Sequence, residues 1–179
     1  MRIEDLAKKN LETVEIKGWV TNKRESKGLI FLNLRDGSGI VQCIVSMDTI
    51  GASLFDKISS LGLESSLEIS GDLVQDDRQI GGVEIHVSTV KIIQSVNDYP
   101  IANKEHGADF LLDKRHLWLR SRRQWAIMRV RNTIVYSVHQ FFQKEGFVQM
   151  DAPILTANAC EGTSDLFTED YFDQDAYLS

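Results

Sequence analysis

Alternation of apolar and polar residues with a period of two dominates the first half of the chain and restricts its possible folds. Five segments show this alternation, and each is rich in Val, Ile or aromatic residues: 13–20, 28–34, 39–45, 66–74 and 82–93. Such segments, bounded by turn-forming residues, are typical of half-buried β-strands. Between the third and fourth, residues 53–62 carry apolar residues three or four apart, which predicts a short amphipathic helix.

Three strands, a helix and two further strands, in this order, predict an all-β fold, the five-stranded OB-fold barrel. A small sandwich is the alternative, although a sandwich does not need the helix at that point. The face formed by the second and third strands of an OB-fold binds oligonucleotides. We therefore expect residues 1–98 to form a barrel with a potential nucleic-acid surface.

The apolar period changes from two to that of a helix after a linker predicted at 99–113. One stripe at helical spacing then runs along the chain: Ile127, Val130, Ile134, Val138 and Phe141. Gly146 is placed to end this helix, and residues 147–150 are expected to form a short strand that stops before Pro153. From Thr156 onward the sequence predicts loop. Residues 114–179 therefore look like the incomplete start of an α+β domain.

Composition excludes several classes of protein. The 179 residues carry a net charge of −6, with two distant cysteines and four scattered histidines that form neither a disulfide framework nor a metal-ligand pattern. The charged start and the lack of a long apolar run predict a cytoplasmic protein without a membrane span and without a metal site. The charge is uneven, because residues 114–131 hold seven Lys or Arg and no acid. A block of this kind is common on solvated helices and also in RNA-binding proteins.

Residues suited to RNA recognition occur on the second and third predicted strands. Phe31 offers a ring on which an unpaired base can stack, and the amide of Gln42 can donate and accept hydrogen bonds at once. Lys23 and Arg24, at the entry to the second strand, are candidates for phosphate contacts. A phenylalanine in a strand is more often part of the core, so the pattern alone leaves both interpretations open.

The segment 122–155 resembles one enzyme family. It reads RRQWAIMRVRNTIVYSVHQFFQKEGFVQMDAPIL, with Gly146-Phe147 after the helix and Pro153 near its end. This sequence is similar to motif 1 of the class II aminoacyl-tRNA synthetases. CEGTSDLF (160–167) and DYFDQDAYLS (170–179) are similar to the aspartyl/asparaginyl subgroup, and RHLWLRSRRQ (115–124) resembles its asparaginyl members more than its aspartyl members.

The resemblance implies roles for barrel residues in binding the tRNA anticodon. Phe31 matches the phenylalanine that stacks on the central anticodon base, and Gln42 matches the glutamine that reads the edge of that base. Glu84 matches a glutamate that contacts a further anticodon base. Arg24 stands at a phosphate-contacting basic position, and Lys23 stands where an arginine is common. The alternative for Glu84 is a solvated strand residue.

The resemblance also implies roles for residues after the barrel. Glu161 and Gly162 match a lid loop over the amino-acid pocket, in which the glutamate binds the ammonium group of the amino acid. The motif 1 region forms the dimer interface in this family, which points to Ile134, Val138 and Pro153 and to a homodimer.

The resemblance finally implies an activity that this chain cannot perform alone. Motifs 2 and 3, which hold ATP in this family, are expected beyond residue 179, so we expect a fragment without catalytic residues and without bound cofactor. The complete enzyme is expected to use ATP and Mg²⁺ to attach asparagine to its tRNA. Two alternatives stay open, namely a non-discriminating aspartyl-tRNA synthetase and a non-catalytic OB-fold module that binds RNA.

Overall fold

The computed structural model describes residues 1–8, 11–79, 81–101, 104–157 and 167–178. The chain forms two compact units, Met1–His106 and Gly107–Ser179. The division predicted from the sequence, with a linker at 99–113, stays a prediction.

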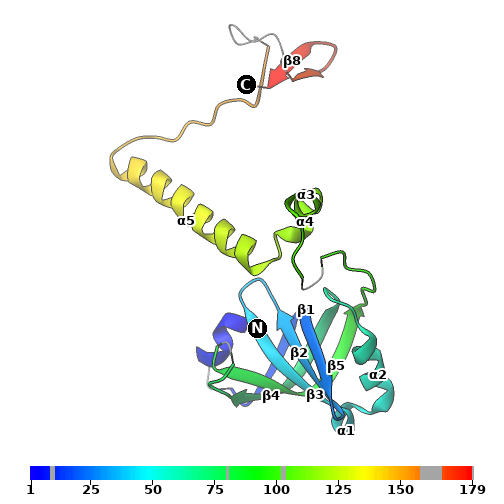
Figure 1. Ribbon diagram of the computed structural model, residues 1–179. Coiled ribbons are helices and arrows are strands. Elements are labelled where there is room, and N and C mark those ends of the chain that lie inside the picture. The colour runs from blue at the N-terminus through cyan, green and yellow to red at the C-terminus, as the bar shows by residue number, and fades with distance from the viewer. Residues whose placement is uncertain (9–10, 80, 102–103, 158–166, 179) are drawn as a thin grey trace. The chain divides into compact units, whose positions relative to one another are not determined.

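The first unit is a closed five-stranded barrel (Figure 1). Its strands follow the order β1-β2-β3-β5-β4 around the barrel. Their bounds are Thr13–Ser26 for β1, Leu29–Arg35 for β2, Ile40–Ser46 for β3, Ser66–Gln75 for β4 and Val83–Gln94 for β5. All neighbouring strands are antiparallel except β3 and β5, whose parallel pairing closes the barrel. The OB-fold prediction is confirmed, because the closed barrel carries its helices between β3 and β4.

Strict alternation of side chains fills the barrel interior. In β2 and β3 every second residue is buried, and the residues between them are partly exposed. Helices α1 (Met47–Ile50) and α2 (Ala52–Ser60) follow β3, and α2 buries Phe55 and Ile58 in the same core. The N-terminal 3-10 helix η1 (Ile3–Lys8) adds Ile3 and Leu6 to that core.

The second unit contains a long helix that begins and ends at recognisable caps. After the short helices α3 (Ala108–Asp113) and α4 (Arg115–Trp118), helix α5 spans Arg122–Lys144. The Ser121 hydroxyl accepts a hydrogen bond from the backbone N–H of Gln124, as an N-cap residue does. At the other end Gly146 has a φ of +86°, so the left-handed residue expected after a helix is a glycine.

Two expectations about the end of the chain are wrong. Residues 147–150 form no strand: no strand among the described residues pairs with them, and their side chains are exposed. Beyond Thr156 the chain is not all loop. A small antiparallel sheet of order β6-β8-β7 joins Leu155–Thr156 (β6), Asp175–Leu178 (β8) and Thr168–Asp170 (β7).

None of the helices among the described residues is long and apolar enough to cross a membrane.

The carboxylate of Asp36 attaches η1 to the barrel. It accepts hydrogen bonds from the backbone N–H groups of Ile3, Ser38 and Gly39 and from the Ser38 hydroxyl. Burial alone would raise the pKa of Asp36, but these hydrogen bonds outweigh it and hold the pKa below its ordinary value. The ionised form therefore binds the N-terminal segment.

Replacing Asp36 by Ala should lower the free energy of unfolding by about 2 kcal/mol at pH 7, because three backbone donors lose a charged acceptor. The folded pKa is depressed, so this contribution is complete above the unfolded pKa of about 4 and is lost as pH falls through the folded value. Urea unfolding at pH 7 and at pH 3 measures both effects. A difference between wild type and variant that does not shrink at pH 3 would contradict the assignment.

Candidate nucleic-acid interface

Strand register brings four of the five candidate RNA-binding residues of the barrel onto its outer surface. Arg24 of β1 stands opposite Phe31 of β2, and Gln42 of β3 stands beside Glu84 of β5. His86 follows on the same side of β5, two residues after Glu84. We call the surface formed by Arg24, Phe31, Gln42, Glu84 and His86 the barrel face.

Phe31 lies on the outer side of β2 with a guanidinium against its ring. The ring is half-buried, and its neighbours Ile30 and Leu32 point inward and are fully buried. The Cζ atom of Arg24 lies 4.8 Å from the ring centroid, within the range of a cation–π contact. The barrel face therefore combines an aromatic ring with an adjacent positive charge, which are the side-chain types that stack on bases and contact phosphates.

The polar part of the barrel face is a connected set of three side chains. Gln42 Nε2 donates to Glu84 Oε2 at 2.9 Å, and His86 Nε2 lies 3.0 Å from Glu84 Oε1. Glu84 is only 7% exposed, so it is not the solvated strand residue that the sequence left as an alternative. His86 is a member of this set that the sequence analysis missed. Its period-two spacing from Glu84 is the signal in the sequence that could have found it.

Lys23 lies on the opposite side of β1 from Arg24. The pairing of β1 with β2 shifts between Val20 and Asn22, so the following residues change sides. Lys23 is consequently opposite the buried Leu32, and its Nζ donates to the backbone carbonyls of Ser59 and Leu61 at the end of α2. Burial lowers the pKa of Lys23, against a smaller raising effect of Glu25.

The candidate interface residues of the second unit lie on exposed surface. Ile134 is 58% and Val138 48% exposed, and Pro153 is also exposed. Glu161 and Gly162 lie outside the described residues. All of these assignments stay predictions.

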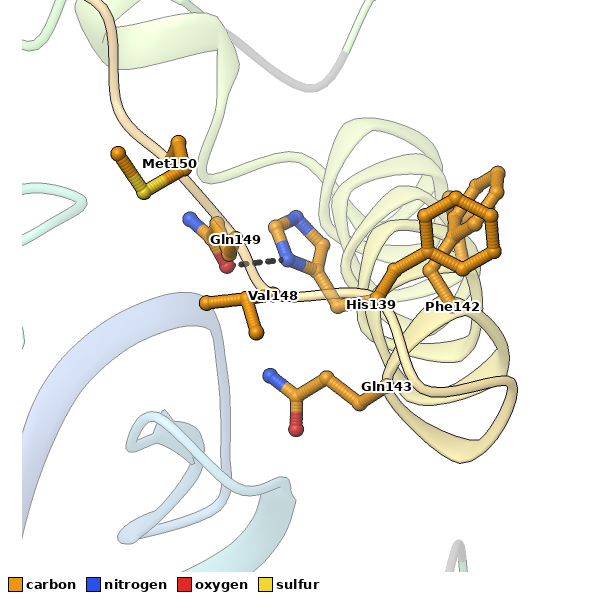
Figure 2. Close-up of a pocket in the computed structure, with 8 residues that line it drawn as sticks. His139, Phe142, Gln143, Val148, Gln149 and Met150 are labelled. Carbon is orange, nitrogen blue, oxygen red and sulfur yellow. Dashed lines mark hydrogen bonds between the residues drawn. The ribbon is translucent and has the colours of Figure 1, made fainter.

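A shallow pocket lies between the second half of α5 and the segment that follows it. Figure 2 shows His139 from the helix beside Gln149 and Val148 from that segment, and Phe142 and Met150 also line the pocket. His139 Nδ1 and Gln149 Oε1 are 2.8 Å apart, and this hydrogen bond links the segment to the helix. The pocket is mainly apolar and holds no cluster of titratable groups suited to catalysis.

Among the residues that the structure describes, no three His, Cys, Asp or Glu side chains are grouped as a metal site would require. The described cysteine, Cys43, is buried in the barrel core, and burial raises the pKa of its thiol to about 12. It is therefore an inert core residue rather than a nucleophile.

Two family models match the chain, one for each unit. Residues 14–93 match the OB-fold nucleic acid binding domain of the tRNA anticodon type. Residues 107–177 match the class II tRNA synthetases of the D, K and N group.

Solved structures of asparaginyl-tRNA synthetases are similar to the chain. The enzyme of Pyrococcus horikoshii complexed with asparaginyl-adenylate is 35% identical, with a TM-score of 0.90 over 100% of this chain and 42% of its own. The enzyme of Entamoeba histolytica in complex with asparaginyl-adenylate is 27% identical, with a TM-score of 0.72 over 93% of this chain and 39% of its own. The chain thus spans about two fifths of the length of these relatives.

A putative aspartyl-tRNA synthetase from Leishmania major is also similar, with a TM-score of 0.80. It is 20% identical over 100% of this chain and 38% of its own, and this likeness shows the shared fold alone.

Replacing Lys23 by Met should destabilise the barrel by about 1 kcal/mol, because carbonyl groups at the end of α2 lose a cationic donor. Thermal unfolding measures the effect. Lys17→Met is the matched control on the same strand, since Lys17 is exposed and forms only a surface ion pair with Glu68. If the two variants were equally stable, the prediction that Lys23 stabilises the end of α2 would be wrong.

Proposed function

Because residues 14–93 match the anticodon-type OB-fold domain and residues 107–177 match the class II tRNA synthetases of the D, K and N group, we propose that the whole protein attaches asparagine to tRNA with the use of ATP. The observation that carries the proposal is the 35% identity over the full chain to an asparaginyl-tRNA synthetase that binds asparaginyl-adenylate. The aspartyl alternative rests on a likeness in fold alone. The match of residues 107–177 argues against an isolated RNA-binding module.

In this proposal the first unit binds the anticodon loop through the barrel face. Phe31 stacks on the central anticodon base, Gln42 hydrogen-bonds to the edge of that base, and Arg24 contacts a phosphate. The half-buried ring, the adjacent guanidinium and the neighbouring amide support these roles. Glu84 is assigned to a further anticodon base, and Lys23 stands apart from the other four.

The second unit contributes the start of the catalytic domain. We assign the ammonium of asparagine to Glu161, with Gly162 giving the loop its backbone freedom. The described residues do not provide a site for Mg²⁺, and we place ATP and Mg²⁺ in the part of the catalytic domain that the relatives have in addition to this chain.

We also propose that the motif 1 region of this protein forms a homodimer interface. The predicted apolar stripe of α5 is exposed, with exposed fractions between 44% and 60%: Ile127, Val130, Ile134, Val138 and Phe141. No described residue of the second unit buries this stripe. An apolar surface of this kind is typical of a contact with a second copy of the chain or with the rest of its own domain.

Replacing Phe31 by Ala should weaken binding of an asparagine anticodon stem-loop by about 1–3 kcal/mol, because a base loses its stacking partner. Fluorescence anisotropy measures the affinity, and thermal unfolding should change little. Trp19→Ala is the matched control, since Trp19 is an exposed aromatic residue of β1 with its own guanidinium, Arg35, at 6.0 Å. Unchanged binding after loss of Phe31 would remove the barrel face as the anticodon site.

Replacing Ile134 by Asp should weaken self-association by at least about tenfold, because a charge would be buried in the apolar contact. Sedimentation velocity over the micromolar range measures it. Asn132→Asp is the control, since it adds the same charge on a different side of α5. A protein that is monomeric throughout, with or without the Ile134 substitution, would exclude the interface from this part of the chain.

A further inference from the structure

His86 occupies a place in the barrel face to which neither the family resemblance nor the comparisons assign a role. Its side chain is 51% exposed, and its Nε2 atom lies 3.0 Å from Oε1 of Glu84. The other carboxylate oxygen of Glu84 accepts from Gln42 Nε2 at 2.9 Å. The three residues therefore form one chain of hydrogen bonds that ends at the amide predicted to read a base.

Strand pairing determines the positions of all three residues. The parallel register of β3 and β5 places Gln42 beside Glu84 and Ile44 beside His86. On the other side of β5, Gly71 of β4 approaches so closely that a Cβ atom there would clash with the carbonyl oxygen of His86. The backbone at His86 is thus held from both sides, and its imidazole Nε2 lies within hydrogen-bonding distance of Glu84.

The ionised carboxylate of Glu84 fixes the orientation of the Gln42 amide. A carboxylate only accepts hydrogen bonds, so it can bind the NH₂ end of the amide and not its carbonyl end. The carbonyl oxygen Oε1 and the second N–H of Gln42 are then left to face a base. Rotating the amide by half a turn would bring two acceptors together and leave a buried carboxylate oxygen without its donor.

His86 provides the second donor that holds the carboxylate in this orientation. Only 9% of the Glu84 side chain is exposed, so water replaces a lost donor poorly. Other charged residues near Glu84 do not donate this second hydrogen bond to its carboxylate. Arg78 acts on Glu84 electrostatically but donates its hydrogen bonds to Asp76, and Asp72, the β4 residue opposite His86, carries no donor.

We propose that His86 is a positioning residue for base recognition: it holds Glu84, and Glu84 locks the amide of Gln42 in one orientation. This inference rests on the proposed function, because it concerns the same anticodon-binding surface. The ligand class is an unpaired nucleobase in an RNA loop. A locked amide distinguishes bases whose edges carry donor and acceptor in opposite order, whereas a freely rotating amide accepts both.

Uracil and cytosine provide the required pair of ligands. Uracil presents an acceptor at O4 and a donor at N3, and cytosine presents a donor at N4 and an acceptor at N3. The two bases have similar size and stack similarly, so their discrimination reports the hydrogen-bonding order alone. A stem-loop with the asparagine anticodon GUU and one with GCU differ in this respect at the central base.

The experiment measures the affinities of residues 1–179 for both stem-loops by fluorescence anisotropy. We expect wild type to prefer the GUU loop by about tenfold or more. His86→Leu should reduce the preference to below about threefold, mainly by tightening the GCU loop, because the amide can then rotate. His86→Gln should restore the preference, since its amide N–H can donate to Glu84. Ser88→Ala, which removes an exposed hydroxyl of the same strand bonded to Ser70, should leave it unchanged.

A double-mutant cycle separates positioning from a general structural effect. If His86 acts through Gln42, His86→Leu should change the preference of Gln42→Leu by less than about 1.5-fold. Additive losses of preference in the cycle would overturn the proposal. So would a His86→Leu variant that weakens both loops equally or retains the full preference for GUU. A wild-type protein that binds both loops equally would overturn anticodon reading by Gln42 itself, and with it this proposal.

Discussion

The parallel pairing of β3 with β5 is the contact on which the rest of the barrel depends. It closes the sheet, and it is formed by three residue pairs, with Cys43 beside Ile85 at its centre. Those two side chains point inward and are fully buried, whereas the flanking pairs point outward. Closure of the core and assembly of the polar part of the barrel face are therefore the same structural event. A shift of one residue would turn Glu84 toward the apolar interior and Ile85 toward the outer side of the barrel.

The local pattern of the sequence predicted the strands of the barrel and the helix between them, because alternate burial in a strand and burial of one face of a helix each require apolar residues at a characteristic spacing. It did not predict which strands pair. The contact of Gln42 with Glu84 joins residues 42 positions apart, and no local period contains that information. The position of Lys23 shows a second feature that the sequence pattern did not predict. Adjacent residues of a strand face opposite sides, and one shift of register near Thr21 decides that Arg24, and not Lys23, faces outward with Phe31.

The two units differ in how completely they bury their apolar residues. The barrel encloses its core by closure and adds η1 and α2 where further apolar side chains are available. Helix α5 also carries an apolar stripe, but the residues of this stripe remain about half exposed in the described chain. Residues 147–150 have a strand-like sequence, but no strand in the described part of the chain pairs with them. Helix formation needs only local hydrogen bonds, whereas a strand needs a partner.

Burying the Glu84 carboxylate with Gln42 and His86 on the barrel face costs desolvation free energy, which the apolar core of the barrel offsets. A β-branched apolar residue at position 84 would suit the strand and would avoid desolvation of a carboxylate. Glu84 instead requires donors from two neighbours, Gln42 and His86, to remain buried. The inner layer of Ile and Leu side chains is complete without these groups. Stability is therefore carried by the inner side of these strands, and the outer side is free to hold the polar arrangement to which we assign base recognition in our proposal.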